Sequence, residues 1–151
     1  MKYFEDLEVG YVSEQGTKRL TKEDIIEFAM EFDPQPFHVD EAAAAESIFG
    51  GIIASGLQTL CICNKLSYEA FYEGIEIVAG KGIDGMRFYE PVCPGDVLSV
   101  EVEVVGLESD SGPPGRGLVE IRVRGFNQRD EKVVGYTTYS YVARRTTERT
   151  Y

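Results

Sequence analysis

The sequence is poor in metal-ligating and cross-linking residues. Its 151 residues include three cysteines and one histidine, whereas a structural zinc site takes about four such ligands. An odd number of cysteines also does not predict a disulfide framework. We therefore expect no metal site, and we expect Cys61, Cys63 and Cys93 to be small, buried apolar side chains.

Positive charge is scarce as well. Lysine and arginine number 15 against 26 aspartates and glutamates, which gives a formal net charge of −11. Affinity for nucleic acid depends on lysines and arginines that neutralise phosphates, so nucleic acid is not an expected partner.

Long apolar runs are missing too. No stretch approaches the ~18 apolar residues of a membrane-spanning helix, and the acidic segment 1–6 has no apolar stretch behind it. The sequence therefore predicts neither a membrane segment nor a secretory signal. We expect a soluble protein of the reducing cytoplasm.

What is present is an ordinary globular composition. Hydrophobic residues make up 43% of the chain and charged residues 27%. A chain of this length buries roughly 70% of its unfolded surface, which is enough for one core. We expect a single domain over residues 1–151, in which residues 146–151 form a loose polar tail.

The first half of the chain carries helix signals. Thr21 and Asp24 have the spacing of a capping box, and apolar side chains then recur at helical spacing as far as Phe32. Prolines at positions 34 and 36 push the residues before them out of the helical region. Residues 33–38 are therefore predicted to form a stiff, extended loop.

Two further helices are predicted after this loop. Asp40 has the position of an N-cap for a short helix over 41–48, and Ser55 precedes a longer helix from Gly56 to about residue 72. The longer helix is apolar around most of its circumference, which predicts that it is buried. Asn64 is the polar exception on its apolar stripe.

The second half changes to a two-residue period. Apolar and polar residues alternate as in half-buried strands, which we expect at 75–88, 98–104, 119–123 and 133–142, with a hairpin turn at 109–115. Helices followed by antiparallel strands favour the α+β class. The predicted architecture is one layer of curved sheet around one central helix.

Asp33 and His38 form the first candidate site. They place a carboxylate and an imidazole five residues apart, and histidine can exchange a proton near physiological pH. Such a pair could hold a water molecule and act in general acid–base catalysis. The alternative is structural, with Asp33 capping a turn and His38 a satisfied surface or core residue.

The start of the long helix is the second candidate. Backbone N–H groups there lack intrahelical acceptors, and Gly56 has no side chain to keep a substrate oxygen away. This is the geometry of an oxyanion donor, although Ser55 and Gly56 would also suit an ordinary helix start. Ser55 does not match a serine-nucleophile elbow, because that motif needs glycine where this chain has Ile53.

Asn64 is the third candidate. A buried amide needs hydrogen-bond partners, so Asn64 points either at the water of Asp33 and His38 or at a neighbouring carbonyl. The segment 80–82 lacks the context and the third glycine of a dinucleotide fingerprint. No nucleotide cofactor is expected.

Three blocks of the sequence, taken in order, resemble a known family. Residues 33–40 (DPQPFHVD) and 49–56 (FGGIIASG) resemble the hydratase motif of MaoC-like dehydratases and R-specific enoyl-CoA hydratases. Residues 87–96 (RFYEPVCPGD) are similar to the strand and turn that follow the helix in that family. The resemblance implies a hot-dog fold, in which a curved antiparallel sheet wraps a long helix.

The resemblance also implies a reaction and its residues. Asp33 and His38 would be the catalytic pair for reversible addition of water to a 2-enoyl thioester, which gives a 3-hydroxyacyl thioester. The Gly56 N–H would polarise the thioester carbonyl, Ser55 and Asn64 would border the substrate, and Asn64 would support the pair. Departures occur at Gln35, where the family often has asparagine, and at Ser55, where it often has histidine.

The resemblance and the charge together set the expected partners. Family members pair as dimers or higher homo-oligomers, and an open sheet edge is a physical reason for this. The net charge would repel an acidic acyl carrier protein, so acyl-CoA is the expected substrate, without a further cofactor. Lys81 and Arg87 are candidates for contacts to its phosphates.

Two other functions stay open at this point. A hot-dog thioesterase would direct water at the carbonyl instead of the alkene, and it would not need both Asp33 and His38. A non-catalytic acyl-binding or assembly subunit would not need the pair at all.

Overall fold

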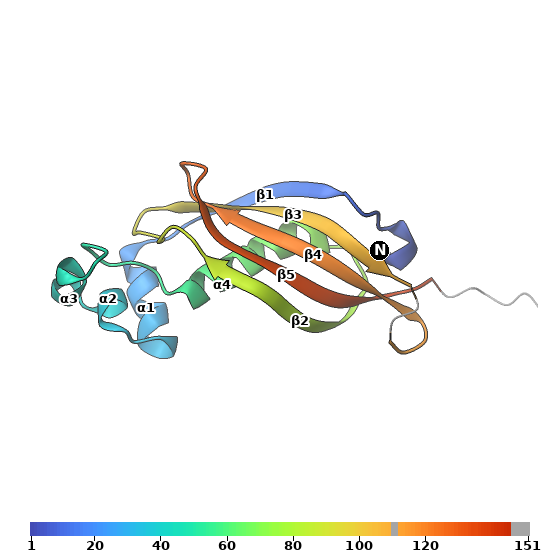
Figure 1. Cartoon of the computed structure of the whole chain (residues 1–151), viewed down its shortest axis with the longest axis horizontal. Coiled ribbons are helices and arrows are strands. Elements are labelled where there is room, and N and C mark those ends of the chain that lie inside the picture. Colours follow the sequence, from blue (N-terminus) through green and yellow to red (C-terminus); the bar gives the residue numbers. More distant parts are fainter. Residues whose placement is uncertain (110–111, 146–151) are drawn as a thin grey trace, which may run out of the picture.

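The computed structural model describes residues 1–109 and 112–145. The predicted tail at 146–151 and part of the predicted turn at 109–115 lie outside the described residues. Within them the chain forms one antiparallel sheet in the order β1-β3-β4-β5-β2 (Figure 1). The strands are β1 (Val12–Arg19), β2 (Ile77–Phe88), β3 (Val97–Glu108), β4 (Arg116–Phe126) and β5 (Lys132–Ala143).

Most of the helical residues lie between β1 and β2 in the chain. The helices are η1 (Phe4–Asp6), α1 (Lys22–Phe32), α2 (Pro36–Val39), α3 (Glu41–Glu46), α4 (Gly56–Ser67) and η2 (Tyr68–Tyr72). Helices α1 to α3 gather beyond one end of the sheet, while α4 runs along one face and contacts β1, β3, β4 and β5 (Figure 1). This confirms the predicted α+β architecture of a curved sheet around a central helix.

The core lies between α4 and the sheet. Cys63 and Leu66 of α4 are buried against inward-facing side chains of the strands, among them Val100, Val102, Ile121, Val123 and Val134. Gly125 permits the close approach, because a Cβ at this position would lie 2.6 Å from the sulfur of Cys63. Burial raises the pKa of the Cys63 thiol to about 12, as expected for a cysteine that only packs.

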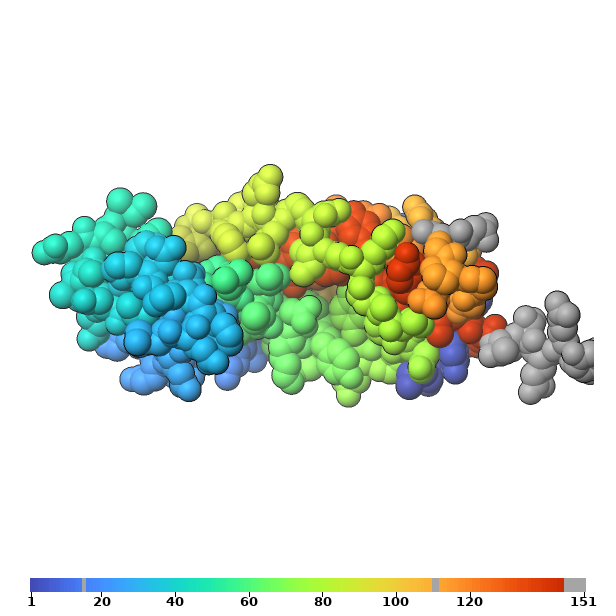
Figure 2. Space-filling view, turned by 90° about the horizontal axis from the view of Figure 1, so that it is seen from below, coloured from blue at the N-terminus to red at the C-terminus, as the bar shows by residue number. Residues whose placement is uncertain are grey.

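The opposite side of α4 is at the surface. Figure 2 shows this segment reaching the surface between α1 and β2. Leu57, Cys61, Asn64 and Tyr68, which recur at helical spacing, are all exposed. The predicted burial of this helix is therefore wrong for this side, and so is the predicted burial of Asn64 and Cys61. These four positions of the apolar stripe seen in the sequence face outward, whereas polar Gln58, Thr59 and Ser67 are buried.

The helix starts were predicted better than the loop between them. The Thr21 hydroxyl accepts from the Asp24 N–H at 3.1 Å and the Asp24 carboxylate accepts from the Thr21 N–H, as the capping box requires. The extended loop predicted at 33–38 is wrong over its second half, because Pro36 begins α2. Proline is well suited to the first turn of a helix, where its missing N–H is not needed. Helix α3 also ends at Glu46, two residues before the predicted end.

Strand β1 was not predicted from the sequence. It is a sheet edge with mainly polar, exposed residues, and its register with β3 shifts between Gln15 and Lys18. The other edge, β2, is exposed along nearly its whole length. In the described residues, no helix is both long enough and apolar enough to cross a membrane.

Candidate active site

Asp33 and His38 are brought together at the end of the molecule where the short helices gather. Asp33 is the C-cap of α1, and His38 lies in α2. The Nε2 atom of His38 lies 3.5 Å from Oδ2 of Asp33. His38 is buried, while a quarter of the Asp33 side chain is exposed, so the carboxylate is the solvent-facing member of the pair.

A backbone carbonyl sets the state of the imidazole. Nδ1 of His38 lies 2.7 Å from the carbonyl oxygen of Ile53. A carbonyl only accepts, so Nδ1 carries the hydrogen and Nε2 of the neutral ring has its lone pair free. The lone pair of His38 and the carboxylate of Asp33 are then two adjacent acceptors, which suits a water molecule that donates one hydrogen to each.

Ser55 supports Asp33 from behind. Its hydroxyl donates to Oδ2 of Asp33 at 2.7 Å and accepts from the N–H of Leu57 at 3.2 Å. Ser55 is fully buried, and its hydroxyl links Asp33 to the start of α4. Ser55 is thus the N-cap of α4, which was one of the two readings of the helix start, and it also contacts Asp33, which was not predicted. Its expected place beside the substrate stays a prediction.

Gly56 lies in the wall of a cavity that also contains His38. The cavity has a volume of about 280 Å³, and its lining includes Thr59, Phe88 and Val92. Gly56 is the first residue of α4, so its N–H has no acceptor within the helix. A Cβ here would lie 2.4 Å from the Phe88 ring, so only glycine permits this contact. A larger groove of about 550 Å³ between α1 and α4 contains neither Asp33 nor His38.

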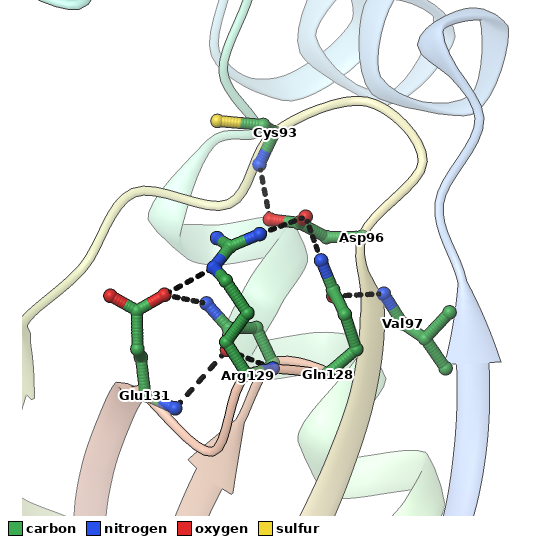
Figure 3. Close-up of polar contacts among 7 residues, drawn as sticks. Cys93, Asp96, Val97, Gln128, Arg129 and Glu131 are labelled. Carbon is green, nitrogen blue, oxygen red and sulfur yellow. Dashed lines mark hydrogen bonds and ion pairs between the residues drawn. The ribbon is translucent and has the colours of Figure 1, made fainter.

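The far wall of the cavity is held to the helix start. The N–H of Ala54 donates to the carbonyl of Val92 at 2.8 Å, two residues before Gly56. Behind Val92, the carboxylate of Asp96 accepts from the Cys93 N–H at 2.9 Å and from the Gln128 side chain at 2.8 Å (Figure 3). The turn between β4 and β5 thus anchors the wall that faces Gly56.

The site differs from the sequence prediction at two sets of residues. Asn64 lies eight residues along α4 from Gly56, about 12 Å at the rise of a helix, and its side chain is exposed and outside the cavity. Sequence reasoning missed the Ile53 carbonyl and the wall residues Phe88 and Tyr89. Residue types do not show where a backbone carbonyl lies. Phe88 and Tyr89 were noticed only as part of residues 87–96, the third block that resembles the family.

Metal-ligating side chains do not cluster in the described part of the chain. Within residues 1–109 and 112–145, no group of three or more His, Cys, Asp or Glu side chains lies close enough together to hold a metal ion. The chemistry that these residues themselves support is proton transfer by a carboxylate and an imidazole beside a backbone N–H donor.

Comparison with known proteins places the chain in a family. Residues 8–121 match the family described as MaoC like domain. The chain is 40% identical to the uncharacterized protein YdeM of Bacillus subtilis (strain 168), over 85% of this chain and 90% of that protein. It is 35% identical to a 3-hydroxybutyryl-CoA dehydratase of Methylorubrum extorquens, over 70% of this chain and 65% of that protein. The crystal structure of a MaoC-like dehydratase from Rhodospirillum rubrum superposes with a TM-score of 0.86 at 37% identity, over 97% of this chain and 100% of that one. The chain therefore belongs to the MaoC-like dehydratase family.

Proposed function

We propose that the chain catalyses the reversible addition of water to a 2-enoyl thioester, with acyl-CoA as the substrate. The observation that carries this proposal is the pair of facing acceptors, Nε2 of His38 and the Asp33 carboxylate, 3.5 Å apart. The N–H of Gly56 shares a cavity with His38, so one substrate could meet both. The dehydratase name of the Methylorubrum relative supports the same reaction class.

The proposed hydration uses one water molecule and two proton transfers. The water forms one hydrogen bond to Asp33 and one to His38. Its oxygen then bonds to C3 of the enoyl group while the pair takes one proton from it. Negative charge moves to the thioester oxygen, where the Gly56 N–H stabilises it. The pair then delivers a proton to C2, so that the hydroxyl and hydrogen of one water are added. Dehydration is the reverse.

The partner and the location also remain our proposals. The three cysteines are free, which supports the predicted reducing, cytoplasmic compartment. We propose a homodimer in which a second copy covers the exposed face of α4 and the start of the open edge β2, around Val78, and leaves the Arg87 end of that edge open. Exposed apolar residues on both elements, among them Leu57, Tyr68 and Val78, support it.

The test is the loss of enoyl-thioester absorbance with crotonyl-CoA and with a longer enoyl-CoA. Asp33→Asn and His38→Ala should each lower the rate at least ~100-fold, as removal of an acid–base group does. Glu31→Gln, an exposed carboxylate two residues before Asp33, is the matched control and should keep full activity.

Three results would contradict the proposal. Release of free thiol without hydration would assign a thioesterase. Hydration that survives both substitutions would refute the mechanism. Binding of enoyl-CoA without either reaction would leave a non-catalytic acyl-binding subunit.

A further inference from the structure

We propose that Lys132 and Arg87, placed around the ring of Tyr89, bind the phosphates of the CoA nucleotide at the mouth of the cavity. This inference rests on the proposed function, because it assigns the part of the substrate that lies outside the cavity. The enoyl group must reach Gly56, so the nucleotide, at the other end of the pantetheine arm, must lie at or beyond the cavity rim.

Tyr89 joins the cavity to this rim. It lines the cavity together with Phe88 and Val133, yet half of its surface is exposed. Its N–H donates to the Val133 carbonyl at 3.0 Å, which ties the residue after β2 to the start of β5. The ring lies beside Gly135, where a Cβ would be 3.6 Å away. Tyr89 is thus held by the sheet while one side of it faces solvent.

Lys132 is held above this ring. Its ammonium lies 4.0 Å from the ring centroid of Tyr89, which is a close cation–π contact. Arg87 borders the same place, because it pairs in register with Gly135, the residue beside the Tyr89 ring. The Nη1 atom of Arg87 donates to the carbonyl of Met86, its neighbour in the chain.

Both cations lack an acidic partner. In the part of the chain that the structure describes, neither Lys132 nor Arg87 forms an ion pair, whereas Arg122, Arg124 and Arg129 each pair with a glutamate. A chain of net charge −11 would repel CoA in general. Lys132 and Arg87, which form no ion pair among the described residues, supply a local attraction for its phosphates at the cavity rim. Glu90 also lines the cavity, so we place the phosphates on the Lys132 side of Tyr89.

Lys81, the other candidate from the sequence, is excluded by its place. It lies six residues before Arg87 in β2, about 20 Å away along an extended strand. Its ammonium lies 5.8 Å from the ring of Tyr141, beside Arg116. Lys81 therefore offers a matched control, since it is also a lysine over a tyrosine and forms no ion pair among the described residues.

The first test compares two substrates that differ in the nucleotide. Lys132→Gln should raise KM for crotonyl-CoA about tenfold, the effect of one lost charge-assisted contact, and the double change with Arg87→Gln should raise it further. KM for crotonyl-N-acetylcysteamine, which lacks the nucleotide, should not change, and neither should kcat for either substrate. Lys81→Gln should leave all four values as in the wild type. Equal changes for both substrates, or an equal effect of Lys81→Gln, would overturn the proposal.

The second test does not depend on turnover. Calorimetric binding of CoA itself should weaken about tenfold in Lys132→Gln and stay unchanged in Lys81→Gln. If neither crotonyl thioester is hydrated but this pattern holds, the proposed reaction fails and the phosphate site stands. Binding of 4′-phosphopantetheine, the arm of a carrier protein, as tight as that of CoA would overturn the assignment to the nucleotide.

Discussion

His38 is the only histidine in the chain, so one imidazole signal reports on the site without assignment. The Ile53 carbonyl 2.7 Å from Nδ1 predicts that the neutral ring carries its hydrogen on Nδ1. Long-range ¹H–¹⁵N correlation spectra of the neutral ring should show a protonated Nδ1 and an unprotonated Nε2. A hydrogen on Nε2 would remove the acceptor that the proposed water needs.

Ser55 joins the helix start to the Asp33 carboxylate, and its two contacts predict two separable effects. Ser55→Ala should lower kcat about tenfold because Asp33 loses its donor, and should lower the free energy of unfolding by about 1 kcal/mol because α4 loses its N-cap. Rates with crotonyl-CoA and urea unfolding measure them. Ser47→Ala, which removes a hydroxyl bonded to the Ala44 carbonyl, should leave kcat unchanged. An unchanged kcat in Ser55→Ala would contradict the positioning contact.

Cys63 should be chemically silent in the folded protein. Its pKa of about 12 lies well above the ordinary thiol value, so the thiolate fraction at pH 8 is on the order of 1 in 10⁴ and rises only as pH approaches 12. Mass spectrometry after alkylation at pH 8 should find Cys63 unmodified in native protein and modified in denaturant. Native labelling of Cys63 would show that α4 separates from the sheet.

At this scale the sequence selected candidate residues but did not show their contacts. Spacing made Asp33 and His38 candidates, a helix start did so for Gly56, and the resemblance supplied their proposed roles. The contact between Ser55 and Asp33 joins residues 22 positions apart, and only the folded chain shows it. Asn64 was misplaced because polarity within a stripe does not reveal which stripe faces the core.

Among the elements, those with strong local signals were predicted and those set by tertiary contacts were not. The capping box fixed the start of α1, and strict alternation identified β3, β4 and β5. Strand β1 escaped because an exposed edge carries few apolar residues. The buried side of α4 is set by its packing against the sheet, where Gly125 allows a close approach.

Gly125 provides the test of that approach. Gly125→Ala would put a methyl group 2.6 Å from Cys63 Sγ and 2.9 Å from a Val134 methyl, and should cost about 1–3 kcal/mol of unfolding free energy. Cys63→Ala should cost less in this background than in the wild type, because it relieves part of the clash. Gly51→Ala, where a Cβ would also meet nothing within 4 Å and which lies outside the proposed interface, is the control for urea unfolding. Equal stability of the two glycine variants would refute the close packing.

The two sheet edges are β1, which contacts α4, and β2, which borders the exposed face of α4 in Figure 2. A second copy could cover that face and the start of β2 at once. Val78→Lys on β2 should shift sedimentation from dimer toward monomer, because it places a charge in the interface. Val12→Lys on β1 is matched in exposure, 47% against 46%, and should leave the dimer intact. A wild-type monomer at micromolar concentration, or an equal effect of both changes, would contradict the proposed interface.

The α+β class was predictable because apolar residues recur with a helical period in the first half of the chain and with a two-residue period in the second. The order of the strands was not, since β1 and β2 lie at opposite edges although only helices and loops separate them in sequence. A local pattern identifies one strand at a time. The order of the strands in the sheet depends on how the whole sheet packs over α4.

The proton-transfer groups and the Gly56 donor all come from one short stretch, residues 33–56, while the facing wall comes from residues 88–92 and from Val133. For the proposed function, the groups that handle water and the wall that faces them therefore come from separate segments of the sequence. Substitutions in residues 88–92 should then change which acyl groups fit the cavity and leave Asp33 and His38 in place.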